Sequence, residues 1–99
     1  MNYKVQVRRA AELDIAGAQV WYESQRPGLG TELHSEITRT FAILTESPLI
    51  YPVLYRDVRR ALIHRFPYLL WYRVQRNNVT VLALTHARQD PQKATKRLR

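Results

Sequence analysis

Apolar residues near the start of the chain change from an alternating to a helical period. The segment 3–7, which reads YKVQV, alternates and predicts a short, half-buried strand. From Ala10 onward the apolar residues recur every three or four positions, which predicts an amphipathic helix. This helix should end near Gln25, because Pro27 disfavours helical geometry in the residue that precedes it. Its apolar stripe is formed by Ala11, Ile15, Ala18 and Tyr22, with Leu13, Val20 and Trp21 alongside.

A second helix follows directly, after a Pro-Gly-Leu-Gly turn at residues 27–30. It should begin near Thr31 and end at Ser47-Pro48, because proline is not tolerated in a helix interior. Its apolar residues recur at spacings of four, four, four and three, at Leu29, Leu33, Ile37, Phe41 and Leu44. Two helices joined by so short a turn should pack as an antiparallel hairpin.

After a connector at residues 49–55, the chain predicts three strands, at about 57–66, 68–75 and 79–85. Pro67 lies in a tight connection between the first two, and Asn77-Asn78 suits a two-residue hairpin turn because asparagine tolerates positive φ. Both links are short, so an antiparallel meander is expected. Alternation in the first of these strands places Arg65 on the face of Ala61 and Ile63, opposite Leu62, His64 and Phe66, and leaves open which face meets the helices.

This order of elements indicates an α+β fold with an N-terminal strand, an antiparallel helix hairpin and a three-stranded antiparallel meander. Packing both helices on one face of a single sheet is the simplest way to bury their stripes. The first strand should join the sheet beside a later strand, and the opposite face should stay open to a partner. We expect one domain, residues 1–99, in which about 88–99 form a basic tail that is flexible or briefly helical.

The aromatic residues are assigned mainly to the core. Trp21, Tyr22, Phe41 and Phe66 are expected to pack between the helices and the sheet. For Tyr68, Trp71 and Tyr72, packing is favoured over the stacking of nucleotides on an exposed sheet.

Charge is distributed very unevenly along the chain. Residues 1–55 carry five Lys/Arg against six Asp/Glu, a balance of −1, whereas residues 56–99 carry eleven against two, a balance of +9. A strand-bearing half this positive predicts a polyanion or an acidic protein segment as partner. Thirteen of the sixteen basic residues are arginine, whose planar fork of donors suits phosphate and carboxylate. The alternative is a solvated basic face with no specific partner.

Composition also excludes several kinds of site. A chain of 99 residues can build one two-layer core, burying about 60–65% of its unfolded surface, but not a large internal active-site cavity as well. The absence of cysteine excludes disulfides and thiolate metal sites. His34, His64 and His86 lie on separate elements without ligand spacing, so neither a metal nor a cofactor is expected. Because no signal peptide and no bilayer-length apolar run is apparent, a cytoplasmic protein without membrane contact is expected.

Several motifs, in order over nearly the whole chain, resemble one known family. They are DI at 14–15, WYE at 21–23, QRPGLG at 25–30, YP at 51–52, RRAL at 59–62, RFPY at 65–68, WYRV at 71–74 and VLAL at 81–84, followed by His86 and Arg88. With them the chain resembles the RelE/ParE family of toxins from type II toxin–antitoxin pairs. The resemblance implies the fold derived above and a cognate antitoxin whose C-terminal segment wraps the toxin. It leaves two targets open, because RelE-like members cleave messenger RNA on the ribosome and ParE-like members poison DNA gyrase.

Metal-free RNA cleavage would need an acid, a base and cations that stabilise the charged phosphorane. For this alternative the candidate catalytic residues are Arg65, Arg88 and His86, with His64 as a second candidate acid or base. Two parts of the RelE pattern are missing. Leu69 occupies the strand position where the RelE pattern has an arginine. Ala94 occupies the position near the C-terminus where that pattern has an aromatic residue.

The absence of this arginine and this aromatic residue favours a growth-inhibiting toxin that binds its target and needs no catalytic side chains, as in ParE-like inhibition of DNA gyrase. The candidate target-binding residues are Arg59, Arg60, Arg65, Arg88 and Arg97. For Arg60 and Arg65, a salt bridge to a helix carboxylate is an equal alternative. The alternative function is a RelE-like, ribosome-dependent mRNA endoribonuclease. The second alternative is a non-toxic homologue that acts with its antitoxin in a repressor complex.

Overall fold

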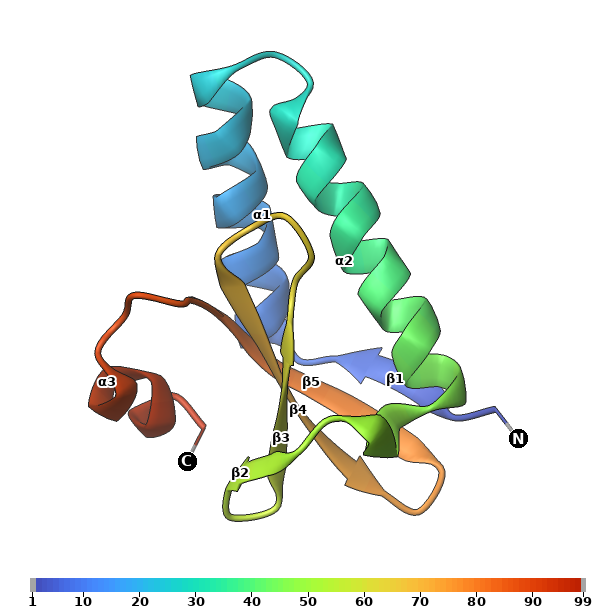
Figure 1. Ribbon diagram of the computed structural model, residues 1–99. Coiled ribbons are helices and arrows are strands. Elements are labelled where there is room, and N and C mark those ends of the chain that lie inside the picture. Colours follow the sequence, from blue (N-terminus) through green and yellow to red (C-terminus); the bar gives the residue numbers. More distant parts are fainter. Residues whose placement is uncertain (1, 99) are drawn as a thin grey trace.

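The computed structural model describes residues 2–98, which form a five-stranded sheet with a helix hairpin on one face (Figure 1). The elements in chain order are β1 (Lys4–Val7), α1 (Arg9–Gln25), α2 (Leu29–Glu46), the 3-10 turn η1 (Pro48–Ile50), β2 (Val53–Tyr55), β3 (Val58–Leu62), β4 (Tyr68–Gln75), β5 (Asn78–His86) and α3 (Pro91–Lys96). This order confirms the α+β class, the helix hairpin and the antiparallel meander.

The strands lie in the order β1-β5-β4-β3-β2. β1 joins the sheet beside β5 and runs parallel to it, with Val5 opposite Val79, as expected for a first strand that pairs with a later one. The long connection that a parallel pair requires is supplied here by the helix hairpin and the meander. The connector expected at 49–55 is only partly correct, because Val53–Tyr55 pairs with β3 as a short edge strand.

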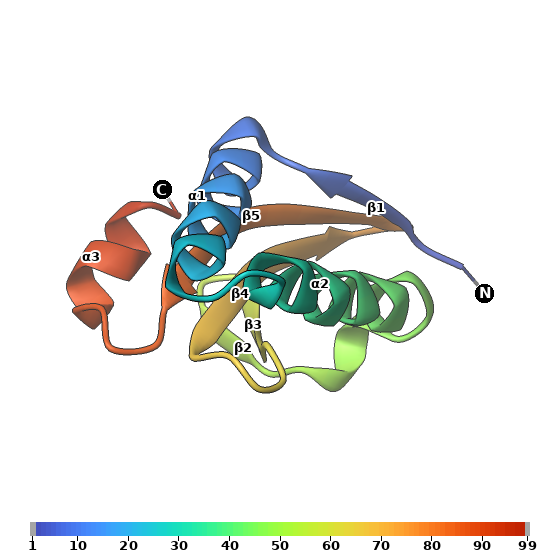
Figure 2. The same cartoon turned by 90° about the horizontal axis from the view of Figure 1, so that it is seen from above.

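The main core lies between the sheet and the helix hairpin (Figure 2). The α2 stripe is buried as predicted, with Leu33 and Leu44 fully inaccessible to solvent. On β4, alternate residues that include Leu70 and Tyr72 point toward the helices. The buried Tyr72 hydroxyl donates a hydrogen bond of 2.5 Å to the carbonyl oxygen of Pro48. This bond connects the end of the helical layer to the centre of the sheet.

A bulge in β5 changes which side chains reach the other face of the sheet. Trp71 pairs with Ala83 while Tyr72 pairs with Val81, so Leu82 is the extra residue. As a result, Leu82 and Ala83 both belong to a second, smaller apolar cluster that also contains Trp71. This cluster lies on the face opposite the helix hairpin and provides a surface for the C-terminal segment.

The C-terminal segment forms the short helix α3 over part of the face that was expected to stay open (Figure 2). The Asp90 carboxylate caps this helix by accepting the Gln92 N–H at 2.9 Å. Ala94 and Leu98, each 4% exposed, complete the second apolar cluster. The briefly helical tail is therefore confirmed, and the prediction of an open face is wrong where α3 covers the sheet.

Polar contacts also hold the C-terminal segment against α1 and β5. The Asp14 carboxylate accepts the Leu84 N–H at 3.0 Å and an Arg97 guanidinium N–H at 2.8 Å. Arg8 donates to the carbonyl oxygens of Leu82 and Arg97, at 3.2 and 3.1 Å. These bonds join the start of α1, the β5 bulge and the end of α3.

Two local predictions are wrong. The strand predicted at 57–66 ends at Leu62, because the following residues turn into β4 with Arg65 at a φ of 72°. Alternation therefore stops there, and Phe66 packs against Tyr22 in the main core together with Ala61 and Ile63, instead of on the face opposite to them. Trp21, predicted to be buried, is 55% exposed. The remaining aromatic predictions are confirmed: Tyr22, Phe41, Phe66 and Tyr68 contact the main core, and Trp71 and Tyr72 are buried.

Candidate functional site

The five arginines predicted to bind a target do not form one surface. Arg59 and Arg60 are neighbours on β3 and therefore point to opposite faces of the sheet. Arg65 lies in the turn that follows β3 and contacts α2. Arg88 lies in the loop between β5 and α3, and Arg97 follows the last turn of α3. Each arginine consequently has different partners.

Arg59 is bound to the main chain before β2. Its Nη1 donates to the carbonyl oxygen of Tyr51 at 2.6 Å and to that of Leu49 at 3.3 Å. These bonds attach the segment 49–51 to β3. Arg59 therefore holds this segment in place, and it is less suited to contacting a target than an arginine whose donors point outward.

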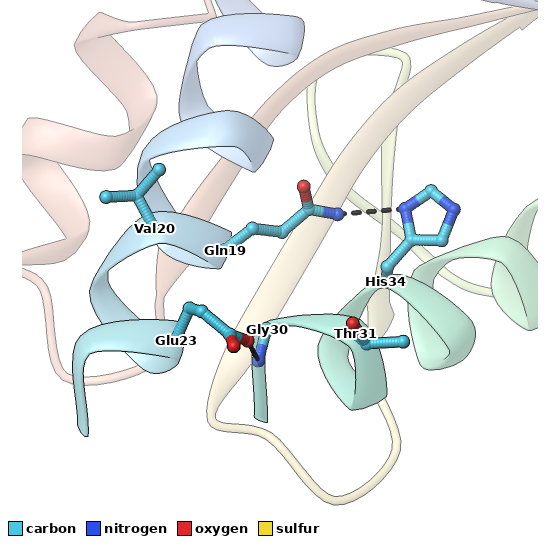
Figure 3. Close-up of a pocket in the computed structure, with 6 residues that line it drawn as sticks. All are labelled: Gln19, Val20, Glu23, Gly30, Thr31 and His34. Atoms are coloured by element: carbon cyan, nitrogen blue, oxygen red, sulfur yellow. Dashed lines mark hydrogen bonds between the residues drawn. The ribbon is translucent and has the colours of Figure 1, made fainter. Parts of the chain in front are cut away.

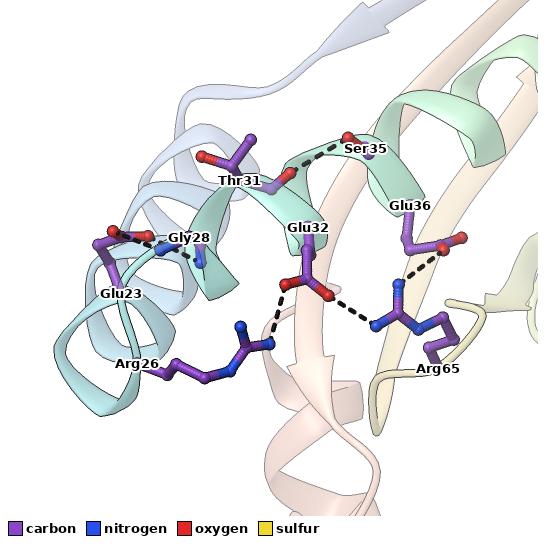
Figure 4. A network of polar contacts seen from close by, with 9 residues as sticks. Glu23, Arg26, Gly28, Thr31, Glu32, Ser35, Glu36 and Arg65 are labelled. Atoms are coloured by element: carbon purple, nitrogen blue, oxygen red, sulfur yellow. Dashed lines mark hydrogen bonds and ion pairs between the residues drawn. The ribbon is translucent and has the colours of Figure 1, made fainter.

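Arg65 belongs to a network of charges at the turn end of the helix hairpin (Figure 4). Its Nη2 lies 2.7 Å from Glu32 Oε1 and its Nη1 lies 3.6 Å from Glu36 Oε2. Arg26 approaches the other Glu32 oxygen at 2.8 Å. Hydrogen bonds from Arg65 and then Arg26 lower the pKa of Glu32, and the bond to Glu32 raises the pKa of Arg65. Of the three roles considered for Arg65, namely catalysis, target binding and a salt bridge to a helix carboxylate, the structure contains the salt bridge.

Reversing the charge of Arg65 is expected to lower stability more than reversing that of Arg88. In Arg65→Glu, a carboxylate would stand beside Glu32 and Glu36, so that attraction becomes repulsion. Arg88 is exposed and has no acidic partner among residues 2–98. Urea unfolding should therefore give a lower midpoint for Arg65→Glu than for Arg88→Glu, with a smaller difference at high salt. Equal midpoints would show that the network contributes nothing to stability.

Arg97 is also engaged within the molecule. Its guanidinium is paired with Asp14, and its carbonyl oxygen accepts a hydrogen bond from Arg8. Target binding by Arg97 would require this pair to open, so its predicted role is not supported by its position.

Arg60 lies in a groove on the face opposite the helix hairpin. Two adjoining hollows of about 480 and 350 Å³ share Arg60, Leu69 and Ala87 and together form what we call the sheet groove. The first is completed by Tyr51, Pro52 and Leu62, and the second by Leu54, Tyr55, Trp71, Thr85, His86, Gln89, Pro91, Ala94 and Thr95. The sheet groove therefore extends from β2 across β3 and β4 to α3, and most of the residues along it are apolar.

Among residues 2–98, Arg60 is the one arginine that lines the sheet groove. Its guanidinium carbon lies 5.6 Å from the ring centroid of Trp71, a cation–π arrangement. The Trp71 ring is fixed in turn by its N–H, which donates to the Thr85 hydroxyl at 2.8 Å. Within residues 2–98 no carboxylate lies within ion-pair distance of Arg60. The sheet groove thus combines apolar walls with a half-buried cation that has no acidic neighbour.

The candidate catalytic residues come together only in part. His86 lines the sheet groove, and its Nδ1 accepts the main-chain N–H of Arg88 at 3.1 Å. Arg65 is held at α2 by Glu32, and His64 lies there too, 3.5 Å from Glu36. RNA cleavage requires the acid, the base and the cations to converge on one phosphate. The predicted set is instead divided between the sheet groove and the helical layer.

A further hollow of about 380 Å³ lies between the two helices near their turn (Figure 3). Its polar groups bind one another, since Gln19 Nε2 lies 2.9 Å from His34 Nδ1. The Glu23 carboxylate accepts the N–H groups of Gly28 and Gly30, at 2.9 and 3.0 Å, and so satisfies donors at the start of α2. These contacts connect the helices and explain the presence of Gln19, Glu23 and His34 in this hollow without a reactive role.

Among residues 2–98, no group of three or more His, Asp or Glu side chains is placed to hold a metal ion. No helix in the described part of the chain has both the length and the apolar character needed to cross a membrane. The sheet groove is the candidate functional site because it combines Arg60 with an exposed apolar surface, next to the loop that carries Arg88.

Two important residues of the sheet groove were not among the predicted site residues. Leu62, which is 63% exposed, and Trp71 lie beside Arg60 on the same face of the sheet. Strand alternation could have placed these residues on the face of Arg60, because residues two apart on a strand point to the same face. Arg60 and Leu62 have this spacing on β3, and Leu69 and Trp71 have it on β4. The contribution of α3 has no comparable signal in its short, polar sequence.

Comparison with known proteins gives a consistent result. Residues 5–91 match the family model described as the ParE toxin of the type II toxin–antitoxin system, parDE. The fold is similar to that of the chromosomal ParDE system from P. aeruginosa, with a TM-score of 0.75 and 17% identity over 85% of this chain and 95% of that chain. It is also similar to a mutant of the E. coli RelE toxin in the free state, with a TM-score of 0.72 and 19% identity over 100% of both chains. For the toxin–antitoxin complex RelBE2 from Mycobacterium tuberculosis, the TM-score is 0.62 and the identity 22% over 87% of this chain and 99% of that chain. No curated protein matches the sequence.

Proposed function

Because this chain belongs to the ParE toxin family of type II toxin–antitoxin systems, we propose that it inhibits bacterial growth by binding DNA gyrase in the cytoplasm. The observation that carries this proposal is the division of the candidate catalytic residues between the sheet groove and the helical layer. A surface with one cation and apolar walls suits inhibition by binding, whereas phosphodiester cleavage needs a convergent acid and base. Arg60 and Arg88 are the arginines proposed to contact the target.

The partner that holds the toxin inactive is proposed to be a cognate antitoxin. The net charge of +8 and the exposed apolar groove both favour an acidic segment that folds on the toxin surface. The similarity to the RelBE2 toxin–antitoxin complex supports a partner of this kind.

The proposal is tested by inducing the chain in growing bacteria and following DNA and protein synthesis over the first minutes. Gyrase inhibition predicts that DNA synthesis fails and the damage response rises while translation continues. Purified toxin should also block supercoiling by purified gyrase. If translation stops first and transcripts show codon-phased cuts, the endoribonuclease alternative is correct. The structural observation that favours this alternative is the contact between His86 and Arg88. Arrest of neither process would support the non-toxic alternative.

Charge reversal of Arg60 and Arg88 together is expected to weaken gyrase inhibition at least tenfold while leaving the fold intact. Neither side chain makes an ion pair within residues 2–98, so the double variant loses no internal salt bridge. The matched control is Arg39→Glu, which removes an exposed arginine from α2. Supercoiling assays give the inhibition constants, and circular dichroism verifies folding. Full inhibition by a folded double variant would remove both arginines from the target-binding surface.

A further inference from the structure

The outward side of α1 carries large apolar residues that are exposed among residues 2–98. Leu13, Val20 and Trp21 are 57%, 70% and 55% exposed. Together with the exposed Gly17 they follow the spacing i, i+4, i+7, i+8, which places all four on one side of the helix. Figure 3 shows Val20 on the side of α1 that points away from His34. This outer α1 stripe is separate from the side of α1 that packs in the main core.

The charges around the outer α1 stripe favour a second copy of this chain as the partner that covers it. No charged residue lies on the stripe itself, although the chain has a net charge of +8. Glu12 and Glu23 border it, so an acidic segment would be repelled there. The exposed Arg9 lies near the first end of the stripe and makes no ion pair within residues 2–98. In an antiparallel pair of α1 helices, Arg9 of one copy would lie near Glu23 of the other.

The outer α1 stripe is also symmetric about its centre, as a two-fold interface requires. Leu13 and Trp21 lie four residues before and after Gly17. Antiparallel pairing centred on Gly17 would therefore place Leu13 of one copy against Trp21 of the other, twice. A Cβ atom at Gly17 would meet nothing within 4 Å, so the space above it is open. The absence of a side chain at the centre allows the second helix to approach closely.

The outer α1 stripe is large enough for a weak dimer. More than half of each large side chain is exposed, which leaves on the order of 100 Å² per side chain. A symmetric pair would bury about 600 Å² through these residues of both copies, and the exposed Ala16 and Ser24 add further area. The total approaches the lower limit of about 1,000 Å² for a specific interface. A dissociation constant in the micromolar range is therefore expected.

We infer that the outer α1 stripe is a self-association surface, on which a second copy of this chain packs its own α1 in the antiparallel direction. Gly17 would lie at the two-fold axis, with Leu13 of each copy against Trp21 of the other. The inference goes beyond the proposed function and does not rest on it. Because the sheet groove lies on the face opposite the helix hairpin, a dimer of this kind leaves both grooves open. Self-association and target binding should accordingly be separable by substitution.

The first test is sedimentation equilibrium of the purified chain over a range of concentrations. The apparent mass should rise from 11.7 kDa toward twice that value. Val20→Gln and Trp21→Gln should each weaken self-association at least tenfold, because each removes a covered apolar contact. Glutamine is a good helix former, so α1 should stay intact in both variants. Urea unfolding at concentrations below the dissociation constant verifies that each monomer is folded.

The matched control is Leu62→Gln, which changes an apolar residue of similar exposure, 63%, on the other face of the sheet. It should change the dissociation constant less than twofold. A dimer weakened by Leu62→Gln and not by Trp21→Gln would place the interface on the sheet groove and overturn the inference. A chain that stays at 11.7 kDa at the highest attainable concentration would overturn it as well.

The second test determines the direction of the two helices, since the chain contains no cysteine and an introduced thiol reports on its own position. At an interaxial distance of about 8–10 Å, the two residues at the centre are close enough for a disulfide. Gly17→Cys should therefore cross-link on oxidation. Leu13→Cys should not, because its two copies would lie about 12 Å apart along the helices. A mixture of Leu13→Cys and Trp21→Cys should cross-link to a heterodimer.

Cross-linking of Leu13→Cys as readily as Gly17→Cys would indicate a parallel pair and would overturn the antiparallel arrangement. Cross-linking confined to Gly17→Cys and to the mixture would support it. None of these results depends on gyrase. A chain that dimerises through α1 without inhibiting supercoiling would refute the proposed function alone, and a monomeric inhibitor would refute only this inference.

Discussion

Replacing Tyr72 by alanine is expected to lower the free energy of unfolding by about 4 kcal/mol, a large part of the stability of a domain of this size. Tyr72 is fully buried at the centre of β4, and its ring packs edge-on against Tyr51 at 6.4 Å between centroids. Removing a buried aromatic side chain costs about 3–5 kcal/mol, because apolar contacts are lost and a cavity remains. Domains of this size have total stabilities of only about 5–15 kcal/mol. Urea unfolding followed by circular dichroism measures the loss.

The control is Tyr72→Phe, which keeps the ring and removes only the hydroxyl. The buried Pro48 carbonyl would lose its hydrogen-bond donor, a change worth about 1–2 kcal/mol. A phenylalanine variant as unstable as the alanine variant would show that this one hydrogen bond, rather than packing, makes Tyr72 important. A stable alanine variant would contradict the assignment of Tyr72 to the centre of the core.

The pH dependence of unfolding provides a second measurement on the same variants. Burial raises the pKa of Tyr72 to about 12, whereas a tyrosine in an unfolded chain has a pKa of about 10. The folded state therefore favours the neutral phenol, and this contribution is complete below about pH 10 and is lost as the pH rises toward about 12. Wild type should lose more stability across this range than Tyr72→Phe does. Burial also raises the pKa of Tyr68, but Tyr68 is present in both proteins and does not affect the difference.

The sequence predicts best the elements whose burial follows a single local period. The α2 residues from Leu29 to Leu44 form one apolar stripe, and that stripe is the one that packs on the sheet. α1 is different because it carries apolar residues on two sides. Ala11 and Ala18 are buried, whereas Leu13, Val20 and Trp21 remain more than half exposed. Local periodicity cannot decide which of two apolar sides faces the sheet, and this is why Trp21 was misplaced.

The end of β3 shows a second limit. Arg65 adopts a left-handed conformation that glycine and asparagine favour, so its sequence gives no sign of the turn that ends the strand at Leu62. Alternation continued beyond Leu62 therefore placed Phe66 opposite Ala61 and Ile63, although all three pack in the main core. A strand pattern predicts side-chain direction only as far as the strand continues, and this strand ends at Leu62.

The sequence predicts where positive charge is concentrated, but it does not predict which arginines form ion pairs within the molecule. The excess of arginine pointed to the second half of the chain, which contains Arg60 and most of the lining of the sheet groove. Two other candidates are neutralised by acids distant in sequence, since Arg65 bonds Glu32 across 33 positions and Arg97 bonds Asp14 across 83. Which arginines remain available is therefore a property of the tertiary structure, and no local pattern contains it.

The same substitution, glycine to alanine, is expected to have opposite effects at two positions of the helix hairpin. At Gly30 a Cβ atom would lie 2.7 Å from the carbonyl oxygen of Gln19 and 3.1 Å from Glu23 Cβ. Because one of these atoms belongs to the α1 main chain, the helices would have to separate, and overpacking of this kind costs about 1–3 kcal/mol. The shift would also disturb the bond from the Gly30 N–H to Glu23.

Gly17→Ala is the matched control in α1, where a Cβ atom would meet nothing within 4 Å. Alanine is favoured over glycine in a helix interior by about 0.5–1 kcal/mol, so this variant should be more stable than wild type. The two variants should therefore lie on opposite sides of wild type in urea unfolding, separated by about 1.5–4 kcal/mol. Helix propensity alone predicts stabilisation at both positions. A stabilised Gly30→Ala variant would thus show that the hairpin can open without cost, whereas a loss confined to Gly30 identifies the close approach of α1 and α2 as the feature that requires glycine there.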